Sequence, residues 1–179
     1  MMQKKVQIIS DGSLDLSQEL TKEKDIEVVP FYVSFDSETY QKEMVEVGVR
    51  EFYQEMVDHP TVFPKTSMPS VHDYYEVFEK HAKEKMPVIC ICITRKFSGS
   101  LQSATTAKDM ILEEYPDAQI TVIDSTVNTV LQGLYVLEAC RLRDMGLEYQ
   151  QIVDALLPIR ETGRIFFTIG SIDYLKHGG

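Results

Sequence analysis

A continuous apolar run from Pro87 to Ile93 constrains the fold of this 179-residue chain more than any other segment. A strand with one solvated face alternates apolar and polar residues, whereas a parallel strand covered on both faces is apolar throughout. The run therefore predicts a central strand of a parallel sheet. It includes Cys90 and Cys92, which we interpret, together with Cys140, as reduced thiols packed like small hydrophobic side chains.

The rest of the chain alternates between apolar strands and amphipathic helices. Strands are predicted at residues 6–9, 27–35, 120–123 and 164–169, helices at 14–24, 49–57, 70–82, 104–115, 130–145 and 149–157, a loop through Pro64 and Pro69, and a helical turn at 171–176. Strands joined by helices imply right-handed crossovers, so we expect an α/β fold with an open parallel sheet and helices on both faces. We expect this domain to cover residues 1–160, and residues 161–179 to begin a second, truncated α/β domain.

Charge and hydropathy restrict the partners and the location that we expect. The 28 Asp and Glu residues outnumber the 18 Lys and Arg residues, and the net charge of -10 would repel nucleic acid. The apolar stretch near the N-terminus is too short for a signal peptide, and no segment reaches the ~18 apolar residues of a membrane span. We therefore expect a cytoplasmic protein without a transmembrane segment.

Three hydroxyl-rich segments follow predicted strands. They are residues 10–13, 94–100 and 124–129. Ligands of open α/β sheets bind outside the carboxyl ends of the strands. The middle segment leads into a helix, so Ser98, Gly99 and Ser100 could offer hydroxyls and free N–H groups to an anion; alternatively, they only cap the helix and form a turn. We interpret Asp11 and Asp124 as turn formers or helix caps, although either could orient a base or a metal ion.

The usual catalytic signatures are missing. The sequence contains neither a G-x-G-x-x-G motif after the first strand nor a P-loop, and the segment around Ser98 does not match G-x-S-x-G. The four histidines are scattered without the spacing of metal ligands. We therefore assign no catalytic residue, no metal and no cofactor.

Six short segments occur in the order typical of one known family. They are residues 10–16, 29–33, 65–70, 97–104, 122–125 and 174–179. Lys65-Thr-Ser-Met-Pro-Ser70 is similar to the family's T-S-Q-P-S, and Phe97-Ser-Gly-Ser-Leu-Gln-Ser-Ala104 is similar to its L-S-G-T-x-x-S-A. On these segments the chain resembles the DegV family of fatty-acid-binding proteins.

The resemblance implies a carrier rather than an enzyme. It implies a long-chain fatty acid whose carboxylate is held by Thr66 and Ser98, in a pocket shaped by Ser67, Gly99 and Ser100, with the tail in an apolar tunnel. It also implies that the bound acid is presented to a separate fatty acid kinase, which forms an acyl phosphate for phospholipid synthesis.

The chain departs from the family at several positions. Met68 stands where Gln is usual, and Ser100 where Thr is typical. The family continues beyond Gly178-Gly179 with Arg-Ile and most of a second domain, so we expect a truncated member. Two alternatives stay open: an enzyme or binding protein for a small phosphorylated or carboxylated metabolite that uses the helix start at 98–100, and a homologue without function.

Overall fold

The computed structural model describes residues 6–166, 168, 172–173 and 176. The chain forms two compact units. The first comprises residues 1–29 and 69–165, and the second comprises residues 30–68 and 166–179. The sequence pattern does not indicate a separate unit at 30–68, and the domain boundary expected near residue 160 stays a prediction.

A four-stranded parallel sheet forms the centre of the first unit. Its strands are β1 (Gln7–Asp11), β2 (Ile26–Val29), β6 (Val88–Cys92) and β7 (Ile120–Asp124), in the order β2-β1-β6-β7. The apolar run supplies β6, which pairs with β1 on one side and β7 on the other. All five residues of β6 are buried. The prediction of a central parallel strand is therefore confirmed.

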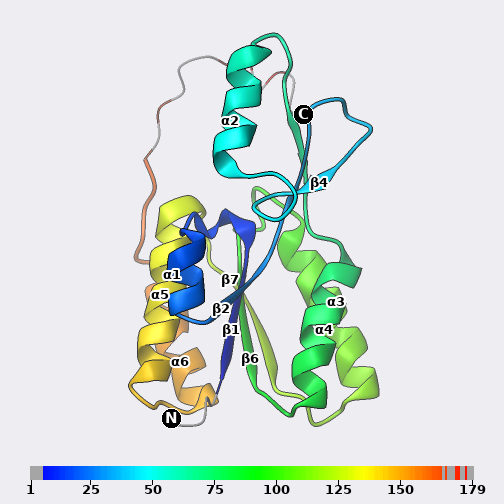
Figure 1. Ribbon diagram of the computed structural model, residues 1–179. Helices are drawn as coiled ribbons and strands as arrows, with labels where there is room; N and C mark the ends of the chain where they lie inside the picture. Colours follow the sequence, from blue (N-terminus) through cyan, green and yellow to red (C-terminus); the bar gives the residue numbers. More distant parts are fainter. Residues whose placement is uncertain (1–5, 167, 169–171, 174–175, 177–179) are drawn as a thin grey trace. The chain divides into compact units, whose positions relative to one another are not determined.

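Helices cover both faces of this sheet. They are the 3-10 turn η1 (Gly12–Leu14) and the helices α1 (Gln18–Glu23), α3 (Val71–Lys83), α4 (Ser100–Glu114), α5 (Thr129–Asp144) and α6 (Tyr149–Ile159). Figure 1 shows α3 and α4 on one side of the strands and α5 and α6 on the other. The predicted α/β architecture, with an open parallel sheet and helices on both faces, is confirmed.

Alternate residues of the strands build two separate cores. Ile89 and Ile91 of β6 pack with Ile152 of α6 in one core. Cys90 and Cys92 pack with α3 and α4 in the other. Both cysteines and Cys140 are free and buried, which confirms their interpretation as thiols in the core.

Helix ends follow the local sequence closely. The side chain of Ser17 accepts a hydrogen bond from Leu20 N at the start of α1. Ser70 and Asp73 form the expected capping box of α3, in which each side chain accepts from the backbone N–H of the other. These contacts satisfy N–H groups that have no partner within the helix.

The predicted strand at residues 27–35 is wrong, because it is two strands in two sheets. Pro30 follows the last residue of β2 and has no N–H to continue the ladder. The chain then enters the second unit, whose elements are β3 (Tyr32–Ser34), β4 (Gln41–Lys42), α2 (Val49–Asp58) and β5 (Lys65–Ser67). Its strands form a small antiparallel sheet in the order β4-β3-β5, and β5 lies in the segment predicted as a loop.

The C-terminal predictions are met only in part. Residues 164–166 and 168 are not in a strand, so the strand expected there is wrong for these residues, while 167 and 169 lie outside the described part. Within the expected turn at 171–176, Asp173 and Lys176 are helical, and Lys176 N donates to Ile172 O. The remaining residues of that turn, except Ile172, lie outside the described part.

Gly133 allows α5 to approach η1 closely. A Cβ atom at this position would lie 2.3 Å from the backbone oxygen of Leu14 and 2.8 Å from Leu16 Cδ2. Only a glycine fits there without displacing the backbone of the turn. The contact brings the neighbouring residue, Gln132, to the end of β1.

We expect Gly133→Ala to lower the free energy of unfolding by about 1–3 kcal/mol, because the added methyl group must displace η1. This loss should appear even though Ala has the higher helix propensity. Gly48→Ala is the control, since an added Cβ meets nothing within 4 Å there. Urea denaturation measures the free energy of unfolding of both variants. Equal, small losses in Gly133→Ala and Gly48→Ala would contradict the close approach of α5 to η1.

Candidate functional site

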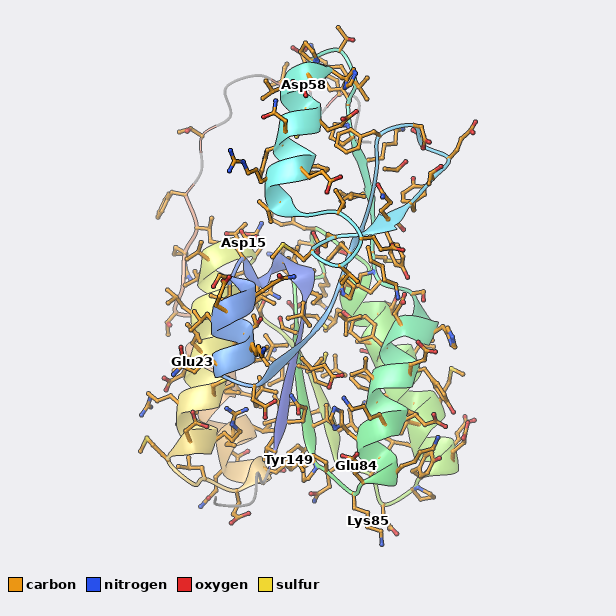
Figure 2. The ribbon with its side chains drawn as sticks, in the orientation of Figure 1. Asp15, Glu23, Asp58, Glu84, Lys85 and Tyr149 are labelled. Atoms are coloured by element: carbon orange, nitrogen blue, oxygen red, sulfur yellow. The ribbon has the colours of Figure 1, made fainter. Side chains whose placement is uncertain are left out.

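Three segments meet at the carboxyl end of the parallel sheet. They are η1 after β1, residues 93–99 after β6, and residues 125–128 after β7. A backbone hydrogen bond from Thr94 N to Val127 O at 3.0 Å joins the last two, and Ser125 N donates to the oxygen of Cys92, the last residue of β6, at 3.0 Å. Figure 2 shows Asp15 near this end of the unit and Lys85 at the opposite end.

The fully buried carboxylate of Asp11 joins the first two of these segments to the helices α4 and α5. Its Oδ2 atom accepts hydrogen bonds from Ile93 N at 2.9 Å and from Ser100 Oγ at 2.8 Å. Its Oδ1 atom accepts from Gln132 Nε2 at 2.8 Å and from Ser13 N at 3.3 Å. Asp11 therefore caps η1, as interpreted from the sequence, and also ties β1 to β6, α4 and α5.

Burial and hydrogen bonding act on the pKa of Asp11 in opposite directions. Burial raises the pKa, and the donors at Ile93, Gln132, Ser100 and Ser13 counteract this rise without cancelling it. Because each carboxylate oxygen accepts two hydrogen bonds, a proton on either oxygen would face a donor. The arrangement of the neighbours fits the ionised form.

The hydroxyl of Ser100 points into the protein. It donates its proton to Asp11, so the hydroxyl of Tyr74, 2.6 Å away, donates to Ser100 Oγ. Burial raises the pKa of Tyr74 well above its usual value. Ser100 is fully buried, and it supports the site from inside rather than offering its hydroxyl to a ligand.

Ser98 has the opposite arrangement. It is half-buried, and its Oγ atom accepts a hydrogen bond from Ser100 N at 3.1 Å, which leaves its own hydroxyl proton free to donate. Gly99 is the N-cap of α4, and helix geometry leaves the N–H groups of Leu101 and Gln102 without a carbonyl partner in the helix. A hydroxyl and N–H groups at a positive helix end can bind an anion.

Thr66 and Ser67 lie in the second unit. Both are exposed residues of β5, where Thr66 pairs with Val33 and Ser67 with Tyr32 of β3. Their side chains sit on a short antiparallel ladder rather than in the loop expected from the sequence. That Thr66 holds a carboxylate together with Ser98, and that Ser67 shapes the pocket around it, stays a prediction.

Gln132 is the residue of this cluster that sequence reasoning missed. Its amide nitrogen donates to Asp11 and to Ser10 Oγ at 3.0 Å, and its amide oxygen accepts from Ser13 Oγ at 2.6 Å. The side chain is fully buried. The available signal was a polar residue on the buried side of a largely apolar helix, where an unpaired amide would be costly.

Asp124, the other acidic residue interpreted from the sequence, also lies at this end of the sheet. Asp124 Oδ1 accepts from Thr126 N at 2.9 Å, which confirms its interpretation as a turn former. Arg95 Nε lies 3.8 Å from Asp124 Oδ2. Among the described residues, no group of three His, Cys, Asp or Glu side chains could hold a metal ion.

The helices of the described residues do not meet the requirements of a membrane span. None of them combines the length and the apolar character needed to cross a bilayer.

We expect Gln132→Ala to lower the free energy of unfolding by about 1–3 kcal/mol, because it removes one donor to Asp11 and one to Ser10 Oγ, and it takes away the amide oxygen that accepts from Ser13 Oγ. Gln150→Ala is the matched control, since Gln150 is exposed on α6 and bonds only to Asp154 among the contacts described; its loss should stay below about 0.5 kcal/mol. Thermal or urea unfolding compares the two. Equal losses would show that the buried amide has no special role.

Comparison with known proteins identifies the family. The model of the DegV family, described as "Uncharacterised protein, DegV family", matches residues 5–179. A DegV domain-containing protein of Halalkalibacterium halodurans is 34% identical over 176 residues, which cover 98% of this chain and 60% of that protein. A DegV domain-containing protein from Clostridium perfringens is 30% identical over 174 residues, which cover 97% of this chain and 60% of that protein.

Solved structures agree with this match. A fatty acid (stearic acid)-binding protein from Eubacterium ventriosum is 48% identical, with a TM-score of 0.92 over 97% of this chain and 59% of that chain. A fatty acid binding DegV family protein from Thermus thermophilus is 29% identical, with a TM-score of 0.80 over 97% of this chain and 60% of that chain. The chain thus spans about 60% of the length of these relatives. The protein belongs to the DegV family.

Proposed function

We propose that this protein binds a long-chain fatty acid and acts as a carrier rather than as an enzyme. One observation carries the proposal: 48% identity and a TM-score of 0.92 to a stearic acid-binding protein over 97% of this chain. The geometry at the carboxyl end of the sheet supports it, since Ser98 and the start of α4 offer donors suited to a carboxylate.

In this proposal Ser98 and Thr66 donate hydrogen bonds to the carboxylate. Hydrogen bonds from hydroxyls to an ionised acceptor are short and strong, so few donors are needed when a helix N-terminus assists. Ser67 and Gly99 lie next to these two residues in sequence, and Ser100 holds the loop from inside. The inward hydroxyl of Ser100 weakens the alternative of a phosphate cradle at 98–100, because it removes one donor.

Apolar surface supplies most of the proposed affinity. Each CH₂ group of the ligand that leaves water contributes ~0.8 kcal/mol. Phe97, beside Ser98, is 62% exposed, and Val130 and Leu134 of α5 are 59% and 55% exposed. These side chains are candidates for contact with the first carbons of the tail.

The proposed partner is a fatty acid kinase in the cytoplasm. The carrier would present the carboxylate to the kinase, which forms an acyl phosphate for phospholipid synthesis. The resemblance of the motifs to the DegV family supports this part of the proposal, and the net charge of -10 argues against a role in nucleic acid binding.

Denaturing extraction of the purified protein, followed by mass spectrometry of small molecules, tests the ligand class. We expect a long-chain fatty acid in stoichiometric amount, because burial of the tail slows its release. A phosphorylated metabolite would favour the alternative function. An empty protein that also fails to take up added stearic acid would contradict the proposal.

Substitution of the two hydroxyl residues tests the head-group contacts. Ser98→Ala and Thr66→Ala should each weaken stearic acid binding by about 1–3 kcal/mol, the range for a lost hydrogen bond to a charged group. Ser98→Thr keeps a hydroxyl, and Thr61→Ala removes an exposed one elsewhere in the second unit; both should bind as the unmodified chain does. Isothermal titration measures all four, and full affinity in both Ser98→Ala and Thr66→Ala would defeat the assignment.

A further inference from the structure

The hydroxyl of Ser98 depends on a chain of hydrogen bonds that ends at Asp11. Ser98 Oγ accepts from the backbone N–H of Ser100 at 3.1 Å. The side chain of the same Ser100 donates to Asp11 Oδ2 at 2.8 Å. One residue thus links the half-buried hydroxyl at the surface with the buried carboxylate below it.

Asp11 holds both ends of the segment that carries Ser98. The Oδ2 atom that accepts from Ser100 at the start of α4 also accepts from Ile93 N at the end of β6, at 2.9 Å. Residues 94–99 therefore run between two attachment points on one oxygen atom. The other oxygen is held by Gln132 and Ser13, which fixes the orientation of the carboxylate itself.

The charge of Asp11 cannot itself assist an anionic ligand. A buried carboxylate behind an anion site repels a second carboxylate, and the low-dielectric interior strengthens this repulsion. If Asp11 contributes to binding, its contribution must come from geometry. Repulsion by the Asp11 charge would weaken binding of the anion, whereas positioning of the donors by Asp11 would strengthen it. Because the two effects change the affinity in opposite directions, an experiment can separate them.

We propose that Asp11 is a positioning residue for the fatty acid carboxylate, acting through Ser100. It holds the first turn of α4 so that the Ser98 hydroxyl and the N–H groups of Leu101 and Gln102 converge on the head group. This inference rests on the proposed function, because it concerns the same ligand.

The test measures stearic acid affinity in the full 179-residue chain. Asp11→Asn is nearly isosteric, but its amide offers one acceptor oxygen where the carboxylate has two. We expect its Kd to rise about tenfold, the change that corresponds to about 1.4 kcal/mol. Ser100→Ala, which leaves Asp11 in place, should show a similar rise, and Ser100→Thr, which restores the hydroxyl, should recover most of the affinity.

Two further variants separate positioning from stability. Ile152→Val shortens a fully buried side chain of α6, so it destabilises the core without touching Asp11, Ser98 or Ser100; its affinity should stay unchanged. The double variant Asp11→Asn/Ser98→Ala should lose less affinity than the product of the two single losses, because residues that act through one another are not additive. Amide hydrogen exchange should rise in Asp11→Asn, and not in Ile152→Val, at Ser100 and Ser103, whose N–H groups donate to Ser98 Oγ and to Gly99 O.

The outcomes distinguish the inference from the proposed function. Failure of the unmodified chain to bind stearic acid overturns both. Weaker binding by Ser98→Ala with unchanged or tighter binding by Asp11→Asn and Ser100→Ala overturns only the positioning role. Unchanged exchange at Ser100 and Ser103, or fully multiplicative losses in the double variant, also overturns it. If Asp11→Asn does not fold, the Ser100 variants decide.

Discussion

The carboxylate of Asp11 is the interaction on which the carboxyl end of the parallel sheet depends. It accepts four hydrogen bonds from four other segments of the chain, namely η1, the β6–α4 connection, α4 and α5. Burying a carboxylate costs free energy, which is why burial raises its pKa. The cost is offset only while all four donors stay in place, so the segments that supply them are fixed together.

The hydrogen bonds of Asp11 determine which polar groups of the neighbouring segments face inward and which face outward. Ser100 and Gln132 direct their polar atoms at Asp11 and are fully buried. Ser98, two residues before Ser100, keeps its proton for an external acceptor. The chain thereby presents hydroxyl and N–H donors at the start of α4. In the proposed function, such a site holds the single charge of a fatty acid, and the tail provides most of the affinity.

Much of the fold could be predicted because burial leaves a pattern in the sequence. The apolar run from Pro87 to Ile93 predicted the central strand, and Ser70 with Asp73 predicted a helix start, since each signal lies within a few residues. Pro30 divides an apolar stretch between two sheets, and this was missed because strand-forming residues stand on both sides of it. Strand pairing between distant segments leaves no such local pattern.

The candidate site was predictable only in part for the same reason. The strand ends and the helix start near Ser98 follow from the order of elements, but the contact between Asp11 and Gln132 joins residues 121 positions apart. The pairing of Thr66 with Ser98 came from the family resemblance and not from periodicity. Thr66 lies on a short exposed strand, where the pattern of apolar residues carries no information about ligands.

The most direct test of the account is a ¹³C NMR spectrum of stearic acid labelled at its carboxyl carbon and bound to this protein. The account predicts one bound carboxyl resonance, displaced from that of the free acid, which shifts when Ser98 is replaced by Ala. A resonance that stays at the position of the free acid, or one that is identical in the unmodified protein and in Ser98→Ala, would contradict a carboxylate held at the start of α4.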